Sequence, residues 1–199
     1  MIDTVVFDLG KVLVDYYPEK AMKMMGFSKD AIKVFLDKVF SGFWESCDKY
    51  PYTDSEIRTL FKRVVPGYEK EVDILWDNVT LMTKAFPYAE EWILSLKKRG
   101  YKVLVLSNYG KVSFEGNVPQ YPFLKHFDGG IISFQAIMLK PEPQIYKELI
   151  DRYNLVPENV VFIDDREDNI AAAKQFGING IVFTDYETAC AQLETILAN

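Results

Sequence analysis

The sequence predicts an α/β fold in which a parallel sheet carries helices on both faces and a helical lobe is inserted after the first strand. From residue 87 onward, apolar runs of strand length alternate with amphipathic stretches of helix length. This alternation is typical of βαβ units and therefore of a parallel sheet. Residues 16–84 instead carry apolar side chains at helical spacing, with no convincing run of period two. A chain of 199 residues has room for one domain with such an insertion.

The first predicted strand is residues 4–7, a β-branched and aromatic run that stops at Asp8, with Gly10 two positions later. This pattern predicts a buried parallel strand that delivers a carboxylate to its carboxyl end. Ligands of open α/β sheets bind at that end, so Asp8 is a candidate functional residue. An aspartate that only caps a turn is the alternative interpretation.

The inserted lobe is predicted to be all-helical. Its apolar residues recur at helical spacing in three runs, at residues 31–39, 57–64 and 72–79. Ser28 and Asp54 precede the first two runs and are candidate N-caps. We therefore expect a helical cap over residues 16–84 and a catalytic core made of residues 1–15 and 85–199.

Strands and helices alternate through the rest of the chain. The predicted strands are residues 102–106, 130–133, 159–163 and 178–183. The predicted helices are residues 87–99, 143–150, 169–176 and 187–197. Gly100 is placed to end the first of these helices, and Pro143 suits the first position of the second. Residues 109–128 contain glycine and proline and are expected to be irregular.

Polar residues at the ends of the later apolar runs are further candidates beside Asp8. They are Ser107, Asn108, Lys140, Asp164 and Asp165. Each has an ordinary structural role open to it, as a turn residue, a solvated lysine or a helix cap. Their joint placement after buried strands favours a single site instead, at the carboxyl edge of the sheet.

The residue types indicate phosphoryl chemistry. Grouped carboxylates are costly unless a divalent cation neutralises them, and oxygen ligands without histidine or cysteine select Mg²⁺. A lysine and a hydroxyl beside that ion supply donors for the oxygens of a phosphoryl group. Asp8 is then available to attack phosphorus and form an aspartyl-phosphate. We therefore expect Mg²⁺ as the cofactor and a small phosphorylated substrate.

Four segments, in this order, resemble the motifs of the haloacid dehalogenase (HAD) superfamily. They are Phe-Asp-Leu-Gly at 7–10, Leu-Ser-Asn at 106–108, Lys-Pro at 140–141 and Asp-Asp-Arg-Glu-Asp-Asn-Ile at 164–170. The helical insertion is similar to the C1 cap of that superfamily. The resemblance implies a Rossmann-like sheet with an inserted all-helical C1 cap. The Asp-Leu-Gly start resembles a phosphatase branch that includes a sugar-1-phosphate phosphatase.

The resemblance also implies roles for the candidate residues. Asp8 would be the nucleophile, and Lys140 would stabilise both the nucleophile and the phosphate. Ser107 would bind phosphate through its hydroxyl, and Asn108, beside it in the same motif, would also be a phosphate-binding residue. The implied metal ligands are Asp8, the Gly10 carbonyl and Asp165, with Asp164 as a more distant or water-mediated ligand.

Gly10 departs from the pattern, because most phosphatases of this superfamily carry a second aspartate there that acts as general acid and base. A glycine can lend its carbonyl to a metal but cannot move a proton. Either the enzyme prefers leaving groups that need little protonation, such as anomeric sugar phosphates or acyl phosphates, or a cap carboxylate such as Glu45 or Asp48 supplies the proton. Lys11, beside Gly10, either helps to hold phosphate or is a solvated or ion-paired lysine.

The leading functional prediction is a Mg²⁺-dependent phosphatase for a small phosphorylated metabolite, with a sugar phosphate as one candidate. A 2-haloacid dehalogenase is one alternative: it would use Asp8 to displace halide from carbon and needs no metal. The pair Asp164 and Asp165, which that chemistry does not require, argues against it. A catalytically weak phosphate-binding or regulatory module is the other alternative, and Gly10 is its main support.

Composition bounds the partners and the location. A net charge of −6 argues against a nucleic-acid partner, because there is no basic excess to neutralise a phosphate backbone. Cys47 and Cys190 lie far apart and are interpreted as reduced thiols. No apolar run approaches the ~20 residues that span a bilayer, and the first strand leaves no room for a signal peptide. We expect a cytoplasmic monomer or homodimer without a membrane partner.

Overall fold

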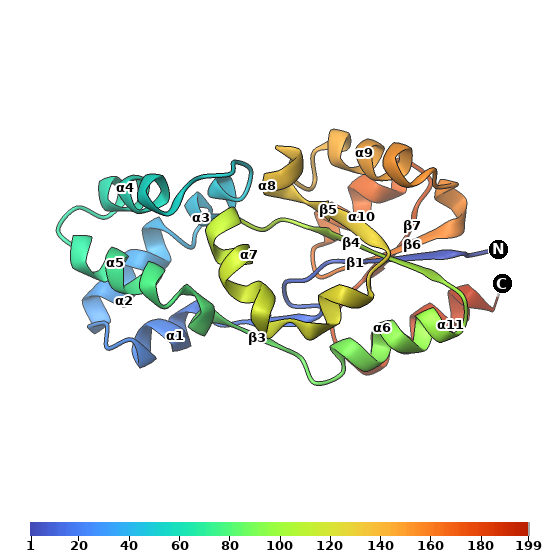
Figure 1. Cartoon of the computed structure of the whole chain (residues 1–199), viewed down its shortest axis with the longest axis horizontal. Coiled ribbons are helices and arrows are strands. Elements are labelled where there is room, and N and C mark those ends of the chain that lie inside the picture. Colours follow the sequence, from blue (N-terminus) through green and yellow to red (C-terminus); the bar gives the residue numbers. More distant parts are fainter. Residues whose placement is uncertain (199) are drawn as a thin grey trace.

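The structure, a computed structural model, describes residues 1–198 and has two parts, a sheet with its flanking helices and a smaller helical cap (Figure 1). The main sheet has five parallel strands in the order β5-β4-β1-β6-β7. In chain order they are β1 (Thr4–Phe7), β4 (Lys102–Ser107), β5 (Gly129–Ile132), β6 (Val160–Asp164) and β7 (Asn179–Val182). The predicted α/β class and the parallel sheet are confirmed.

β1 lies at the centre of the sheet and aligns the strand ends that carry polar residues. Phe7 is paired with Val105 of β4 on one side and with Ile163 of β6 on the other. The backbone N–H of Asp8 donates to the carbonyl of Ile163 at 2.9 Å. Asp8 and Asp164 each follow directly on one of these paired residues. The register therefore brings both carboxylates to the same edge of the sheet.

Four helices cover the two faces of the sheet (Figure 1). They are α6 (Ala89–Lys98) and α11 (Tyr186–Leu197) on one face, and α9 (Pro143–Tyr153) and α10 (Glu167–Lys174) on the other. Val5 and Phe7 pack toward α6 and α11, whereas Val6 between them packs toward α9 and α10. The continuous apolar run of β1 is thus explained by burial on both faces. These helices confirm the four that the sequence predicts in the core.

The cap is built from five short helices around its own apolar cluster. They are α1 (Pro18–Met24), α2 (Lys29–Lys38), α3 (Phe43–Cys47), α4 (Asp54–Val64) and α5 (Glu69–Asp77), followed by the 3-10 turn η1 (Val79–Met82). The fully buried members of this cluster all fall between residues 21 and 82, whereas the buried clusters of the core draw on residues 5–14 and 89–193. This separation supports the predicted boundaries between cap and core near residues 15 and 85. We propose these boundaries for the two parts of the chain.

The two predicted N-caps of the cap helices have different outcomes. Ser28 caps α2, because its hydroxyl accepts from the backbone N–H of Ala31 at 3.1 Å. Asp54 is not the N-cap of α4 but its first helical residue. Thr53 caps that helix in a capping box with Glu56, whose carboxylate accepts from the backbone N–H of Thr53 at 2.8 Å. The reciprocal pair of bonds satisfies two backbone donors, which an aspartate one position later does not achieve.

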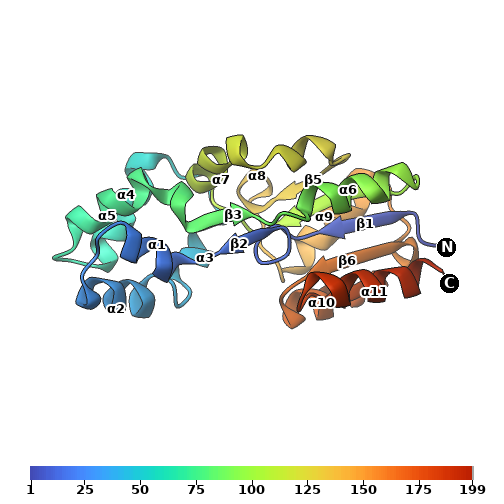
Figure 2. The same cartoon turned by 90° about the horizontal axis from the view of Figure 1, so that it is seen from below.

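A short two-stranded ribbon joins the cap to the core, so the prediction of an all-helical insertion is wrong at its two ends. β2 (Val14–Tyr16) pairs antiparallel with β3 (Thr83–Ala85). Figure 2 shows this ribbon between the helical cap and the main sheet. Each strand has only three residues, which is too short for alternation of period two to be visible in the sequence.

Residues 109–128 are not irregular as expected, because they contain helical segments. These are α7 (Lys111–Asn117) and the 3-10 turns η2 (Val118–Gln120) and η3 (Pro122–His126). Asn117 stabilises α7 by donating to the carbonyl of Ser113 at 2.8 Å, and it also accepts from Thr83 at 3.0 Å. Long-range contacts of this kind override the weak helix propensity of a glycine-containing segment. Two further short elements are α8 (Ser133–Ala136) and η4 (Pro157–Asn159).

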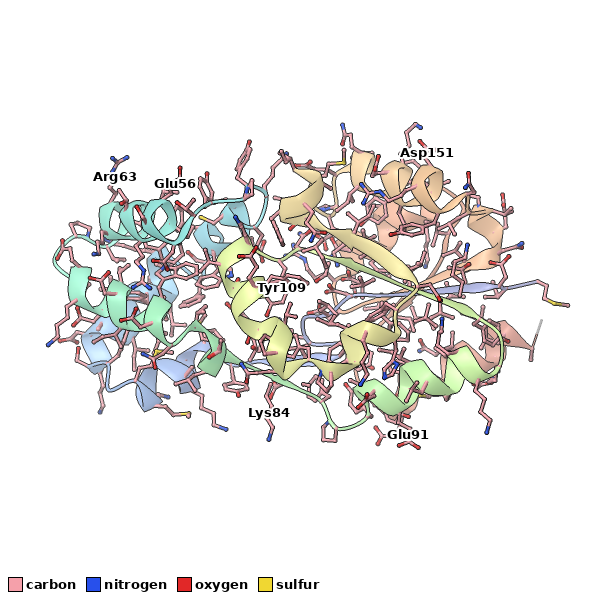
Figure 3. All side chains as sticks on the ribbon, viewed as in Figure 1. Glu56, Arg63, Lys84, Glu91, Tyr109 and Asp151 are labelled. Atoms are coloured by element: carbon pink, nitrogen blue, oxygen red, sulfur yellow. The ribbon has the colours of Figure 1, made fainter. Side chains whose placement is uncertain are left out.

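The helices of the described chain are short. Over residues 1–198, none combines the length and the apolar character that crossing a bilayer requires. Charged side chains such as Arg63 of α4 and Asp151 of α9 point outward, whereas Tyr109 lies at the junction between the cap and the core (Figure 3).

Gly130 of β5 provides a test of the strand packing. A Cβ atom there would lie 2.1 Å from the carbonyl oxygen of Val105, and the residue has a φ of +152°. Gly130→Ala is expected to lower the free energy of unfolding by ~2–4 kcal/mol, because the new methyl group collides with backbone that cannot move aside cheaply. Urea denaturation followed by circular dichroism measures the change.

Gly116→Ala in α7 is the matched control for this substitution. Its Cβ would meet the Cγ2 atom of Thr80 at 3.4 Å, an ordinary contact, and its φ is not in the left-handed region. Alanine in a helix is expected to leave the free energy of unfolding unchanged or to raise it by up to about 1 kcal/mol. Equal effects of the two substitutions would contradict the packing of β5 against β4.

Candidate active site

A cavity of about 210 Å³ is lined by residues of both the core and the cap. Five of the sequence-predicted site residues line it: Asp8, Gly10, Asn108, Lys140 and Asp165. The other two, Ser107 and Asp164, are buried beside this group. The structure therefore brings together the residues that the sequence analysis selected from four separate segments.

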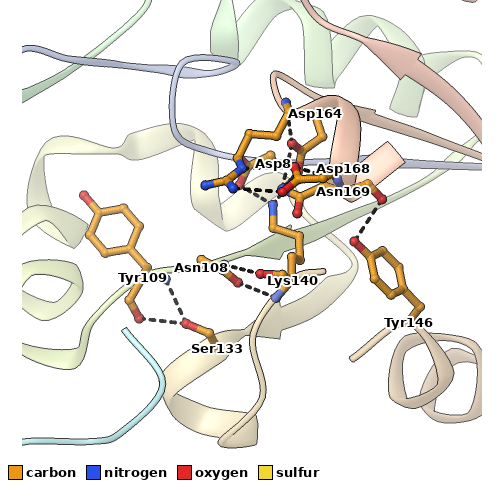
Figure 4. Close-up of polar contacts among 10 residues, drawn as sticks. Asp8, Asn108, Tyr109, Ser133, Lys140, Tyr146, Asp164, Asp168 and Asn169 are labelled. Carbon is orange, nitrogen blue, oxygen red and sulfur yellow. Dashed lines mark hydrogen bonds and ion pairs between the residues drawn. The ribbon is translucent and has the colours of Figure 1, made fainter. Parts of the chain in front are cut away.

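The centre of the site is the ammonium group of Lys140, which lies between two carboxylates (Figure 4). Its Nζ is 2.9 Å from Oδ1 of Asp8 and 2.6 Å from Oδ2 of Asp164. The side chain of Lys140 is 2% exposed, so this charge has no access to bulk water. Opposite charges at this distance are what makes a buried lysine tolerable.

Burial and neighbouring charges shift the pKa values of this group. Burial raises the pKa of Asp8 to about 6; the Lys140 charge lowers it and the Asp164 charge raises it. For Lys140, burial lowers the pKa, but the charges of Asp8 and Asp164 outweigh burial and the net shift is upward. Lys140 is therefore a cation at neutral pH, and Asp8 is mostly ionised.

Asp164 is held by a dense set of hydrogen bonds. Asn169 donates through Nδ2 to both carboxylate oxygens, at 2.9 and 3.0 Å, and the backbone N–H of Arg166 donates at 2.9 Å. The carbonyl of Asn169 in turn accepts from the hydroxyl of Tyr146 at 2.9 Å. With Lys140 included, both oxygens of Asp164 already have partners. Asp164 is thus well suited to orienting Lys140 and less suited to direct contact with a metal.

Asp8, Asp164 and Asp165 form a group that is able to surround a cation. Each offers one carboxylate oxygen, and these oxygens lie within 4.8 Å of one another. Asp165 is less buried, and burial is the main cause that raises its pKa. The only charged side chain paired with Asp165 in residues 1–198 is Lys11, at 3.5 Å. A set of hard oxygen donors without histidine or cysteine fits Mg²⁺.

Ser107 contributes an unused polar atom to the site. Its Oγ is buried and makes no hydrogen bond of normal geometry within residues 1–198. It lies close enough to Asp8 to help lower the pKa of that carboxyl. An orphaned buried hydroxyl is unusual, because leaving it unpaired costs free energy. Its position beside Asp8 is suitable for binding an oxygen of a ligand held at that carboxylate.

Asn108 makes its side-chain contacts with the backbone of Lys140. Its Oδ1 accepts from the Lys140 N–H at 2.8 Å, and its Nδ2 donates to the Lys140 carbonyl at 2.9 Å. This pair of bonds fixes the loop that delivers the lysine. The phosphate-binding role predicted for Asn108 stays a prediction, and the contacts support a positioning role for its side chain.

Three contacts connect one stretch of the cap to the core beside the cavity. Arg166 donates to Glu45 at 2.9 Å, and Lys49 donates to Glu142 at 2.7 Å. The third is the hydroxyl of Ser133, which donates to the backbone carbonyl of Asp48 at 2.7 Å. The sequence gives no signal for Ser133, which it places at the end of the predicted strand 130–133. Only the fold brings it to the cap.

Aromatic residues form the cap wall of the cavity. Trp44 lines it and stacks on Trp76 with ring centroids 5.2 Å apart, and Phe40 stacks on Trp44 at the same distance. Tyr16 of β2 also lines the cavity. Phe40 and Tyr16 carry no signal in the sequence that separates them from core residues.

The chain belongs to the family of haloacid dehalogenase-like hydrolases, whose model matches residues 2–177. The family assignment agrees with the resemblance carried by the four motifs. Among solved structures, an HAD family enzyme of Bacteroides thetaiotaomicron in complex with magnesium and inorganic phosphate has the same fold. Its TM-score is 0.72 at 24% identity, over 94% of this chain and 98% of that one.

Three curated relatives differ in length and in name. Acyl-CoA dehydrogenase family member 10 of Mus musculus is 28% identical over 97% of this chain, which spans only 19% of that protein. D-ribitol-5-phosphate phosphatase of Bacteroides thetaiotaomicron is 26% identical over 89% of both chains. (S)-2-haloacid dehalogenase 4A of Burkholderia cepacia is 28% identical over 49% of this chain and 42% of its own. The chain thus covers about a fifth of the first relatives that it matches and most of the phosphatase.

The contacts of Asn108 lead to a prediction for Asn108→Ala. The buried backbone N–H of Lys140 would lose its partner, so the free energy of unfolding is expected to fall by ~1–3 kcal/mol. Asn179→Ala is the matched control. Asn179 also donates from its side chain to backbone carbonyls, at 3.0 Å, but lies at the edge strand and leaves no buried donor unpaired. Urea denaturation of the two variants should show the larger loss for Asn108→Ala; the reverse order would contradict the inferred role.

Proposed function

We propose that the protein is a Mg²⁺-dependent phosphatase that hydrolyses a small phosphorylated metabolite through an aspartyl-phosphate on Asp8. The observation that carries this proposal is the buried ion pair of Asp8 with Lys140 at 2.9 Å, at the floor of a cavity that also exposes Asp165. It combines a carboxylate nucleophile, a fixed cation and a place for a metal. Relatives that this chain matches over most of their length, such as the ribitol-5-phosphate phosphatase, have names that support the same class of enzyme.

The metal would be held by Asp8, by the backbone carbonyl of Gly10 and by Asp165. A bound Mg²⁺ would neutralise the grouped carboxylates and polarise a phosphoryl oxygen. Asp164 is not assigned as a direct ligand, because its oxygens are occupied by Lys140, Asn169 and Arg166. The proposal thus keeps the predicted ligand set and gives Asp164 the more distant role.

The residues of this chain then act in sequence on the substrate. Asp8 attacks phosphorus, while Lys140 and the free hydroxyl of Ser107 bind phosphoryl oxygens as negative charge develops on them. Water afterwards hydrolyses the aspartyl-phosphate, which regenerates the Asp8 carboxylate and releases phosphate. The cap covers the site during these steps and limits the access of bulk water.

Phosphorylated carbohydrates or polyols are the substrate class that we propose. The cavity combines the aromatic wall of Phe40 and Trp44 with polar groups such as Asn117 and Thr83. Such a surface suits a molecule with hydroxyl groups and apolar C–H faces. The dehalogenase alternative would use Asp8 but does not require the further carboxylate, Asp165, that lies beside it. The measurement of turnover decides the binding-module alternative.

Asp8→Asn is expected to lower phosphate release by at least about 10³-fold, because the amide cannot attack phosphorus. The measurement is phosphate release from ribitol 5-phosphate, glucose 1-phosphate and glucose 6-phosphate in Mg²⁺ or in EDTA. Activity that survives either EDTA or the substitution would overturn the proposed mechanism. Mg²⁺-dependent phosphate binding without turnover would establish the binding module instead.

Asp165→Asn and Asp164→Asn are expected to separate metal binding from lysine positioning. Asp165→Asn should raise the Mg²⁺ concentration for half-maximal rate by at least about tenfold, because it removes a charged ligand. Asp164→Asn should lower the maximal rate with little change in the Mg²⁺ concentration for half-maximal rate, because Asp164 positions Lys140 and is not assigned as a metal ligand. Titration of the rate with Mg²⁺ measures both effects, and an exchange of the two phenotypes would reverse the assignment.

A further inference from the structure

Gly10 has no side chain, so the proposed reaction has no carboxylic acid at that position of the loop. The carboxylates that line the cavity in residues 1–198 are Asp8, Glu45, Asp48 and Asp165. Asp8 and Asp165 already have roles as nucleophile and metal ligand. Glu45 has a side chain that is 62% exposed to solvent and paired with Arg166 at 2.9 Å, so it already has an ion-pair partner. Asp48 is the remaining acid.

Asp48 lies in an environment that favours a protonated carboxyl. The residue is 7% exposed, and within residues 1–198 no lysine, arginine or histidine pairs with its carboxylate. Burial, and secondly the charge of Glu45, raise its pKa well above the usual range, although a hydrogen bond with the backbone of Gly110 acts in the opposite direction. The phenols of Tyr16 and Tyr109 are close enough to sense its charge. Among the described residues, no cation is among the groups that shift the pKa of Asp48, although Lys140 and Arg166 line the same cavity.

The backbone of Asp48 is fixed to the core although the residue belongs to the cap. Its carbonyl accepts from the hydroxyl of Ser133, and that hydroxyl accepts from the backbone N–H of Tyr109 at 2.9 Å. Figure 4 shows Ser133 and Tyr109 in contact beside the loop of Asn108 and Lys140. A cap residue is thus tied through one serine to the loop that follows β4.

Gly110 provides room for the Asp48 carboxyl. A Cβ atom at Gly110 would lie 2.9 Å from Oδ1 of Asp48, which is closer than such contacts normally allow. Any other residue at position 110 would push the carboxyl aside or deform the loop. Gly110 and Ser133 together place Asp48, whose surroundings favour the protonated carboxyl, at the wall of the cavity that contains Asp8.

We propose that Asp48 is the general acid and base of the reaction and takes the place of the aspartate that Gly10 does not supply. This inference rests on the proposed phosphatase function. In the first step, the Asp48 carboxyl gives its proton to the ester oxygen while the P–O bond to the leaving group breaks and the bond from Asp8 to phosphorus forms. The product alcohol leaves, and Asp48 is left as a carboxylate.

In the second step, the Asp48 carboxylate takes a proton from water as the water oxygen attacks phosphorus. The bond between Asp8 and phosphorus breaks, phosphate is released, and Asp48 is again protonated. One water molecule is consumed and the two proton transfers cancel, so the cycle closes without another reactant. General acid and base catalysis of this kind contributes about 10²–10⁴-fold to a rate.

The test is Asp48→Asn with two substrates that differ in leaving group, ribitol 5-phosphate and p-nitrophenyl phosphate. An alkyl alcohol needs a proton to leave, whereas nitrophenolate leaves as an anion. Turnover of ribitol 5-phosphate is expected to fall by about 10²–10⁴-fold. p-Nitrophenyl phosphate is expected to give a rapid burst of nitrophenolate, stoichiometric with enzyme, followed by slow release, because Asp8 is still phosphorylated but water is no longer activated.

Two further variants separate catalysis from structure. Glu45→Gln removes the neighbouring cap carboxylate, whose charge raises the pKa of Asp48, and is expected to lower turnover of ribitol 5-phosphate far less than Asp48→Asn does. Gly10→Asp is expected to restore turnover of the alkyl phosphate in the Asp48→Asn background, because a Cβ at Gly10 meets no atom within 4 Å and the φ there is not in the left-handed region. A residue that only supported the fold would not be replaced by an acid on another loop.

The outcomes separate the proposed phosphatase function from the proposed role of Asp48. If wild-type protein releases neither phosphate nor nitrophenolate, the phosphatase function is overturned and the role of Asp48 with it. If wild-type protein is active but Asp48→Asn lowers the rates on both substrates by the same factor, without a burst of nitrophenolate, only the role of Asp48 is overturned. A wild-type rate that already depends steeply on the leaving group would also overturn it, because that is the behaviour of an enzyme without a general acid.

Discussion

The ion pair of Lys140 with Asp8 and Asp164 is the interaction on which the rest of the site depends. A lysine that is 2% exposed is stable as a cation only with carboxylates beside it, and removal of one partner from such a group typically costs about 3–5 kcal/mol. Several contacts around it serve to hold this geometry. Asn108 fixes the backbone of the lysine, and Asn169 fixes the carboxylate of Asp164. The charged groups are thus positioned before any ligand arrives, so little reorganisation is needed during the reaction.

The parallel sheet explains why these residues meet although they are far apart in the chain. β1 pairs with β4 and β6 in a register that ends all three strands at one edge. A shift of one residue in β1 would move its side chains to the opposite faces of the sheet and draw Asp8 into the apolar layer. Burial of β1 on both faces makes such a shift costly, because Val5, Val6 and Phe7 are completely buried. The hydrophobic core therefore sets the position of Asp8.

Much of this arrangement is predictable from the sequence, because several buried strands that each end in a polar residue are typical of a ligand site at the sheet edge. Asp8 and Asp165 belong to that category, and the fold brings them together with Lys140, which lies in the loop between α8 and α9. The segment of residues 109–128 is not predictable, since α7 is stabilised by tertiary contacts such as that of Asn117 with Thr83. The same holds for Ser133, whose partner Asp48 is 85 residues away in the chain. Local patterns report burial and turns, and they carry no information on contacts between the cap and the core.

The division of the chemistry between two parts of the molecule gives the cap a second purpose. The nucleophile and the lysine belong to the core, whereas Asp48 comes from the cap, so on our proposal the proton donor is in place only when the cap lies against the core. The contacts of Glu45, Asp48 and Lys49 with core residues all lie within this short segment. Closure of the cap would then exclude water and would also bring Asp48, the proposed general acid and base, to the substrate after it has entered. An enzyme built in this way has no need of an acid at Gly10, because the cap delivers one together with the walls that select the substrate.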